Sequence, residues 1–258
     1  MPDLQSQTQT PLTLDNRLVA MISSVLTSAG IPNVLWGNYL LTIYGVPTIV
    51  DGMAFVVPDE YKETALSSIE KAGFAPCIQG QNCPFWIGQR RQPSAGHLHL
   101  NDELAISVYL KSDVLWELSF TEGSPGLLKA SDERLPPAIP GRGQGRFPLK
   151  LDLVQIPHPV RYCEAVIALL CRGYETRAAT YWMAILTYIL EYVDGLDIFD
   201  GNSLKEAYRP FYHALKAGEY SRMYLLLDEL RRHLALRESD YHSVNSRSGP
   251  EFAKEIWD

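Results

Sequence analysis

The chain has 258 residues and a net charge of −7, with 46% hydrophobic and 21% charged residues. This composition is ordinary for a globular protein with a real core, built as one large domain or two small ones. The acidic balance argues against a broad nucleic-acid-binding surface, and no apolar run reaches the roughly 18 residues that would predict a membrane span.

The first part of the chain alternates expected helices and strands. After a polar leader that does not resemble a secretory signal, apolar residues at helical spacing predict a helix that Asp15 or Thr13 could cap. Gly37 interrupts the apolar run before it, and Pro58 ends the next one. The expected elements are a helix over 13–29, a strand over 34–36, a helix over 38–44, a strand over 53–57 and a helix over 59–72. This order predicts a mixed α/β sheet.

The next part carries several strand patterns. Residues 103–111 alternate most regularly, and 96–100 (Gly-His-Leu-His-Leu) alternate apolar and imidazole side chains. Shorter strand patterns cover 75–79, 84–87 and 116–120. Strands that follow one another after short connections pair antiparallel, so the sheet should contain both parallel and antiparallel neighbours.

The second half of the chain changes character. Residues 121–159 are rich in proline and glycine and predict a long loop or linker. Apolar stripes then predict helices over 160–172, 175–193, 204–216 and 220–237. Ser203 opens a capping-box pattern for the third helix, and Pro210 either bends that helix or marks its real start. The predicted organisation is a leader and first helix (1–30), an α/β domain (31–120), a loop or linker (121–159), a helical domain (160–238) and a tail (239–258).

The four cysteines are Cys77, Cys83, Cys163 and Cys171. None lies in C-x-x-C spacing, so we predict neither a zinc site nor a redox motif. Cys77 and Cys83 could approach each other across a turn, but we expect reduced thiols and a cytoplasmic protein.

The segment 34–60 resembles the nucleotidyltransferase superfamily. The matching features are Gly37-Asn38 after the first strand, the helix behind them, Asp51, and the strand that ends in Phe55-Val56-Val57. The chain looks especially like a group of uncharacterised fungal proteins with a nucleotidyltransferase-like domain, through the phrases LWGNYLLTIYGVPT, FVVPDE, VLWEL and GRGQGR. The resemblance covers most of the chain and implies a nucleotidyltransferase-like mixed sheet flanked by helices, followed by a helical C-terminal half.

In that superfamily two carboxylates one residue apart on a strand, with a third from a neighbouring strand, hold divalent metal. Asp51 fits the first position. The second falls on Met53 or Ala54, and in another register the pair falls on Gly52 and Ala54. The resemblance therefore implies a metal site that has lost its carboxylates, and we name no metal ligands. Mg²⁺ would be a cofactor only if transfer survived; the cofactor is otherwise left open.

His97 and His99 lie two residues apart on an expected strand, so their side chains share a face. Asp102 and Glu103 follow closely. This arrangement suits a metal pair or an acid–base site, and we take His97, His99 and Asp102 as candidate catalytic residues. The alternative is a surface-facing strand edge with ordinary polar residues.

Candidates for ligand binding lie on several segments. Arg142 and Arg146 could hold an anion beside glycine N–H groups, or they could be solvated on a mobile loop. Trp36 could stack on a base, or it could be buried in the core. The full candidate set is Trp36, Gly37, Asn38, Asp51, Arg142, Arg146 and Tyr208.

Three functional hypotheses follow. The first is a nucleotidyltransferase-fold protein with a degenerate metal site that binds a nucleotide or other small ligand in a cleft between the two halves. The second is a metal-independent biosynthetic enzyme of fungal secondary metabolism on the same fold, using His97, His99, Asp102 and Arg142. The third is an active transferase that uses Asp51 with Asp102 or Glu103. Whether the chain is an enzyme stays open here. We expect a small-molecule partner, no nucleic acid and no membrane, and make no prediction of oligomeric state.

Overall fold

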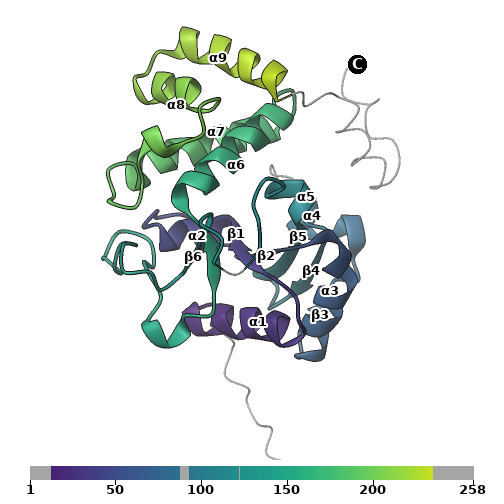
Figure 1. The fold of residues 1–258 in the computed structure, drawn as a ribbon. Helices are drawn as coiled ribbons and strands as arrows, with labels where there is room; N and C mark the ends of the chain where they lie inside the picture. The colour runs from purple at the N-terminus through teal and green to yellow at the C-terminus, as the bar shows by residue number, and fades with distance from the viewer. Residues whose placement is uncertain (1–12, 88–92, 122, 235–258) are drawn as a thin grey trace, which may run out of the picture. The chain divides into compact units, whose positions relative to one another are not determined.

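The computed structural model describes residues 13–87, 93–121 and 123–234, and the chain divides into two units (Figure 1). The first unit runs to Pro159 and the second begins at Val160. No helix within the described ranges is long and apolar enough to cross a membrane.

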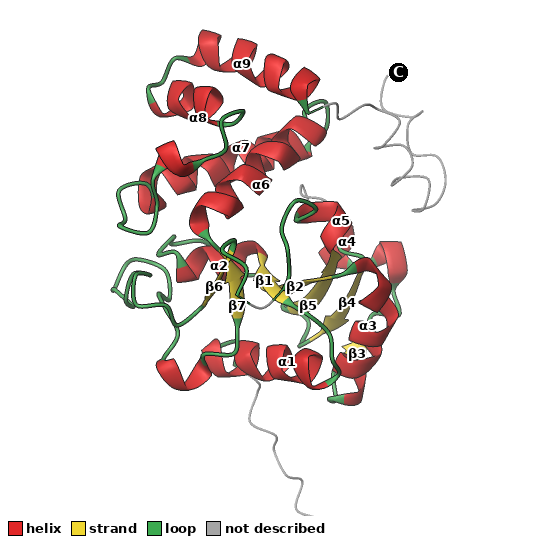
Figure 2. Ribbon diagram, viewed as in Figure 1, coloured by secondary structure: helices red, strands yellow, loops and turns green. Residues whose placement is uncertain are grey.

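The first unit is built on a five-stranded sheet in the order β1-β2-β5-β4-β3 (Figure 2). The strands are β1 (Val34–Trp36), β2 (Gly52–Val57), β3 (Ala75–Pro76), β4 (Gly96–His99) and β5 (Ala105–Leu110). β2 and β5 are parallel, and the other neighbouring pairs are antiparallel. All six residues of β2 are buried, as expected for a central strand that is covered on both faces. The predicted mixed α/β sheet is confirmed.

Helices accompany this sheet. They are α1 (Asn16–Ser28), α2 (Gly37–Ile43), α3 (Lys62–Lys71), α4 (Pro84–Ile87) and α5 (Lys111–Val114), with 3₁₀ turns at Asp59–Tyr61, Gly80–Asn82 and Leu149–Leu151. Asp15 caps α1, because its Oδ1 accepts hydrogen bonds from the N–H groups of Arg17 and Leu18, both at 2.9 Å. α3 covers one face of the sheet, where a Cβ placed on Gly96 would meet the Leu66 side chain.

Two predicted strands are wrong. Residues 84–87 form α4, which begins at Pro84, a residue that fits a first helical turn because its missing N–H would have no partner there. Residues 116–120 form no strand either: the N–H of Leu118 bonds to the carbonyl of Leu115 and closes a turn. A short apolar run does not distinguish these alternatives by periodicity.

The segment rich in proline and glycine belongs by its contacts to the first unit. It contains the antiparallel pair β6 (Leu127–Lys129) and β7 (Gln155–Pro157). The Tyr44 hydroxyl donates to the carbonyl of Pro157 at 2.6 Å, a bond that fastens β7 beside α2. Much of this long loop is therefore held by specific hydrogen bonds.

The second unit is helical, as predicted. It comprises α6 (Pro159–Arg172), α7 (Ala178–Tyr188), a π-helical turn (Ile189–Val193), a 3₁₀ turn (Gly201–Ser203), α8 (Arg209–Lys216) and α9 (Tyr220–His233). The predicted capping box at Ser203 is wrong, because α8 begins at Arg209 and Pro210 marks its real start. The predicted tail (239–258) lies outside the described residues.

Candidate functional site

Three of the predicted ligand-binding residues come together where β1 ends and β2 begins. Gly37 opens α2 with a φ of 75°, a left-handed conformation that glycine adopts without strain. The Nδ2 group of Asn38 donates to the carbonyl of Ile49 at 3.1 Å and reaches Oδ1 of Asp51 at 3.5 Å. Gly37, Asn38 and Asp51 therefore form one polar corner, in which the Asn38 and Asp51 side chains are half-buried.

The strand register decides which side chains share a face of the sheet. Ala54 pairs with Ser107, and Ser107 pairs with His97. Gly52 pairs with Ala105, which pairs with His99. Directly paired residues point to the same side, so both rows lie on one face, which we call the histidine face. The opposite face is the one that α3 covers.

The histidine face does not carry the carboxylates of a two-metal transferase. Ala54 and Ser107 occupy one row, and Gly52 begins the other. Gly52 has a φ of 135°, and a Cβ built on it would overlap the carbonyl oxygen of Ala105. An aspartate at this position would therefore need a shift of the main chain. Met53 points to the other face and is 2% exposed.

The remaining acidic candidates do not restore such a site. Asp102 and Glu103 are exposed in the turn before β5, where Oδ1 of Asn101 accepts from the N–H groups of Glu103 and Leu104, both at 2.8 Å. Within the described residues, Asp51, Asp102 and Glu103 form no group that could hold a metal ion together. The residues present therefore do not fit the two Mg²⁺ ions of a nucleotidyl transfer.

The histidine face instead brings together two histidines and two cysteines. One ligand atom each from Cys77, Cys83, His97 and His99 lies within 4.8 Å of all the others. The sulfur of Cys83 is 3.2 Å from Nε2 of His97 and 3.8 Å from Nε2 of His99. Cys83 and His97 are buried, while Cys77 and His99 are half-buried. We call these four residues the Cys/His cluster.

Each member of the cluster is placed by simple local structure. His97 and His99 alternate on β4, so both rings project from the same face. Cys77 follows β3 and its N–H bonds to the carbonyl of His97 at 3.3 Å, which continues the antiparallel ladder and puts its thiol beside that ring. The chain then turns back through Gly80, with a φ of 52°, and delivers Cys83 over the face.

An aromatic ring packs beside the two histidines of the cluster. The ring of Phe85 lies 6.1 Å from that of His97 and 5.3 Å from that of His99, centroid to centroid. Burial lowers the pKa of His97, with a smaller contribution in the same direction from His99. His97 is therefore held in its neutral form at neutral pH, the form that binds metals.

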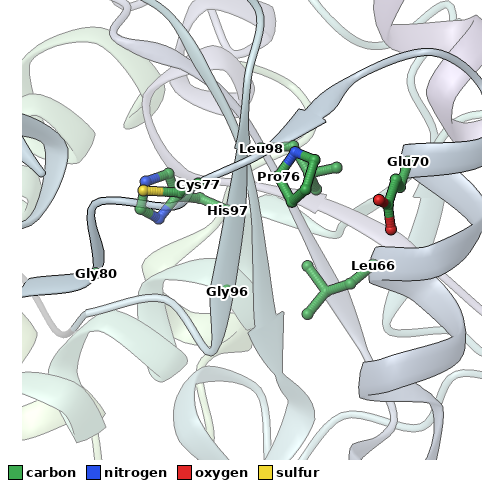
Figure 3. Close-up of a pocket in the computed structure, with 8 residues that line it drawn as sticks. All are labelled: Leu66, Glu70, Pro76, Cys77, Gly80, Gly96, His97 and Leu98. Atoms are coloured by element: carbon green, nitrogen blue, oxygen red, sulfur yellow. The ribbon is translucent and has the colours of Figure 1, made fainter.

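A pocket of about 240 Å³ lies at this edge of the sheet. In Figure 3 the Cys77 sulfur lies beside the His97 ring on one side of β4, whereas Leu98 and Leu66 lie on the other side. The pocket therefore spans the edge of the sheet.

The Arg146 side chain holds its own loop together. Its Nη1 group donates to the carbonyls of Glu133 and Leu135 at 3.1 and 3.0 Å. The N–H of Gly145 bonds to the carbonyl of Thr42 at 3.0 Å. Arg142 is exposed on the same loop. These contacts show that the Gly-Arg-rich segment is a loop that packs on the end of α2.

Trp36 and Tyr208 are both core residues. Trp36 is 3% exposed on β1, and Tyr208 is 1% exposed in the second unit. Neither ring presents a surface on which a base could stack in this structure. Gly37, Asn38 and Asp51 remain as the predicted ligand-binding residues that lie together.

Sequence reasoning identified His97 and His99 as a pair but not the cysteines that join them. The spacing from Cys77 to His99 is C-x₅-C-x₁₃-H-x-H, and a search restricted to C-x-x-C does not find it. The available signal was the His-x-His pattern itself, which puts two imidazole rings on one face of a strand.

Comparison with known proteins gives only distant similarity. No family model matches the chain, and no curated protein matches it. Among solved structures, the solution structure of the antibiotic-resistance factor ANT(2'')-Ia is 14% identical, with 88% of this chain and 97% of that chain covered, at a TM-score of 0.37. The crystal structure of ANT(2'')-Ia in complex with adenylyl-2''-tobramycin is 16% identical, with 86% and 99% covered, at a TM-score of 0.36. At these TM-scores the similarity assigns neither an activity nor a site to this chain.

Proposed function

We propose that the α/β unit binds a small ligand, with nucleotides and nucleosides as the first class to test, and does not carry out metal-dependent nucleotidyl transfer. The observation that supports this proposal is the strand register: Gly52 and Ala54, the positions where the resemblance to nucleotidyltransferases implies carboxylates, share one face of the sheet with Ser107 of the neighbouring strand, and none of the three carries a carboxylate.

Metal-dependent transfer needs cations that bridge the phosphates and neutralise the charge that develops there. The side chains of Ala54 and Ser107 cannot supply that charge. At Gly52 the neighbouring main chain of Ala105 leaves no room for a side chain. Restoring the missing carboxylates would therefore take more than one substitution, which favours a binding role for the remaining architecture.

The polar corner of Gly37, Asn38 and Asp51 supports ligand binding. A half-buried amide and a half-buried carboxylate lie together where β1 and β2 meet, and their oxygens accept from hydroxyl or amine groups. A ribose or an amino sugar offers such groups. A carboxylate at this corner disfavours a bare phosphate, so we expect the ligand's sugar or base to contact Asp51.

An acid–base role for His97, His99 and Asp102 is less well supported. The Nε2 atoms of both histidines face the sulfur of Cys83, and Asp102 lies in an exposed turn. This arrangement favours a metal-binding role for the two imidazoles over proton transfer.

Calorimetry with ATP, CTP, GTP and UTP and with the four nucleosides, each with and without Mg²⁺, tests the proposal. We expect saturable binding of at least one of them that Mg²⁺ leaves unchanged, and no release of pyrophosphate. Asp51→Asn and Asn38→Ala should weaken binding by about tenfold, the loss expected for one hydrogen bond to a charged or polar partner.

The matched control is Asp152→Asn, which changes a carboxylate that pairs with Lys129 at 3.0 Å, away from the polar corner. It should bind like the wild type. Mg²⁺-dependent binding accompanied by pyrophosphate release would contradict the proposal. The absence of any nucleotide or nucleoside binding would contradict its choice of ligand class.

A further inference from the structure

We infer that Cys77, Cys83, His97 and His99 form a structural zinc site. This inference goes beyond the ligand-binding proposal and is independent of it, because it concerns the edge of the sheet at β3 and β4 and not the polar corner.

The ligand set identifies the class of metal. Two cysteines and two histidines are the donors of structural zinc sites, where thiolate sulfur and imidazole nitrogen bind a borderline-soft cation. The cluster contains no carboxylate, and carboxylate oxygens are the donors that Mg²⁺ and Ca²⁺ require. The chemistry of the four side chains therefore selects zinc over the hard cations.

The distances agree with tetrahedral coordination. Zn–N bonds of roughly 2.0–2.1 Å and Zn–S bonds of roughly 2.3 Å place the ligand atoms of a tetrahedron about 3.3–3.8 Å apart. Cys83 Sγ lies 3.2 and 3.8 Å from the two Nε2 atoms, and the four ligand atoms lie within 4.8 Å of one another. Small side-chain movements would bring the two nitrogens and the two sulfurs to these bond lengths around one ion.

The number of ligands indicates a structural role. A catalytic zinc ion keeps one position for water or substrate, whereas four protein ligands close the coordination shell. The position of the cluster gives the ion something to stabilise. β3 has only two residues, both exposed, so it contributes few main-chain or core contacts to this edge of the sheet.

A zinc ion would join three pieces of chain: the end of β3 through Cys77, the start of α4 through Cys83, and β4 through its histidines. The ion would close the loop between residues 77 and 83 and fix it to β4. Both effects restrict the conformations that residues 77–83 can adopt. The ion would thus stabilise the edge of the sheet.

The first test uses the full chain, purified under reducing conditions without chelator and with any affinity tag removed. Elemental analysis should find one zinc per chain. Replacement of zinc by Co²⁺ should give the visible bands of a tetrahedral ion together with a thiolate-to-cobalt charge-transfer band. Failure of the reduced protein to bind either metal would overturn the inference, as would a Co²⁺ spectrum without the charge-transfer band.

Variants separate the site from adventitious binding. Cys83→Ser and His99→Ala should each lose most of the bound zinc. Cys171→Ser should keep one zinc per chain, because Cys171 is a buried cysteine of the second unit outside the cluster. His99→Cys should bind zinc, unlike His99→Ala, and its Co²⁺ form should show a stronger charge-transfer band because a third thiolate binds the ion. If His99 only packed against its neighbours, cysteine at this position would not change the band.

A further measurement covers the case in which Cys83→Ser does not fold. In the wild type, a mercurial reagent that blocks thiols should release zinc to a chromogenic chelator as Cys77 and Cys83 react. Retention of zinc after both of these thiols have reacted, or in the double variant Cys77→Ser/His99→Ala, would contradict the inference.

Discussion

The sulfur of Cys83 lies 3.2 Å from Nε2 of His97, although fourteen positions separate the two residues in sequence. Two independent features produce this contact. The β4–β5 register sets the face from which His97 projects, and the turn at Gly80 returns the chain over that face. The β2–β5 register puts Ala54 on this same face, paired with Ser107, so no carboxylate stands at either position. One face of the sheet thus supports both proposals.

Gly52→Ala should destabilise the protein more than an ordinary glycine replacement. The residue has a φ of 135°, and a Cβ would overlap the main chain of Ala105. We expect a loss of about 3 kcal/mol or more in the free energy of unfolding, from backbone strain plus overpacking against a neighbouring strand. Urea unfolding followed by circular dichroism measures it.

Gly73→Ala is the matched control for Gly52→Ala. Gly73 also has a positive φ, 102°, but a Cβ there would meet no atom within 4 Å. Its replacement should cost only the strain of the conformation, about 1 kcal/mol. Equal losses for the two variants would show that the contact with Ala105 does not matter.

Local patterns predicted much of the fold. Alternation over 103–111 and 96–100 identified β5 and β4, and Asp15 was identified as one of two possible caps of α1. These features depend on residues that are near in sequence. Residues 84–87 and 116–120 were assigned wrongly because short apolar runs carry no period that distinguishes a strand from a helix or turn.

The Cys/His cluster could not be predicted from spacing alone. Its geometry depends on the pairing of Cys77 with His97 across β3 and β4, and on the turn that returns Cys83. The register between β3 and β4 cannot be read from a single sequence. Asn38 and Asp51 were both predicted as ligand-binding residues, from the resemblance to nucleotidyltransferases, but the contact between their side chains was not predicted.

Chelation of the proposed zinc should loosen the sheet edge and leave the second unit unchanged. We expect amide exchange over residues 75–83 and 96–99 to accelerate by about tenfold or more after zinc removal, since the ion ties these segments together. Exchange in α6 and α9 serves as the internal control. Uniform acceleration along the chain, or none at β4, would contradict a local structural role.

Glu164→Gln should destabilise the second unit. Glu164 is 3% exposed on α6; its carboxylate accepts from the Arg161 guanidinium at 2.6 Å and from the N–H of Lys205 at 2.6 Å. Both of these bonds reach Oε1, and Oε2 also accepts from the Arg161 guanidinium at 2.6 Å, so glutamine removes the buried charge and turns an amide N–H₂ group toward that guanidinium. We expect a loss of about 1–3 kcal/mol in the free energy of unfolding.

Glu219→Gln is the control for Glu164→Gln in the same unit. Its partner is Arg222 at 2.8 Å, and the two side chains are 45% and 66% exposed. Exposed pairs of this kind contribute little, so the unfolding midpoint should barely move, by about 0.5 kcal/mol or less. A similar loss in both variants would show that burial does not set the effect at Glu164.

Arg134→Gln should flatten the acid limb of the stability profile. Side-chain hydrogen bonds from Arg134, at 2.8 and 2.9 Å, hold the pKa of Asp132 below its usual value. The unfolded chain therefore binds more protons than the folded one as the pH falls below the ordinary aspartate pKa of about 3.9. The contribution of Asp132 is present above that pH and is lost as the pH falls through the folded-state value. Urea midpoints measured from about pH 6 to pH 2 should fall less steeply in the variant than in the wild type.

Lys129→Gln, which removes the partner of the exposed Asp152 at 3.0 Å, should leave the slope unchanged. Parallel profiles for the wild type and Arg134→Gln would show that the pair does not couple protonation to folding.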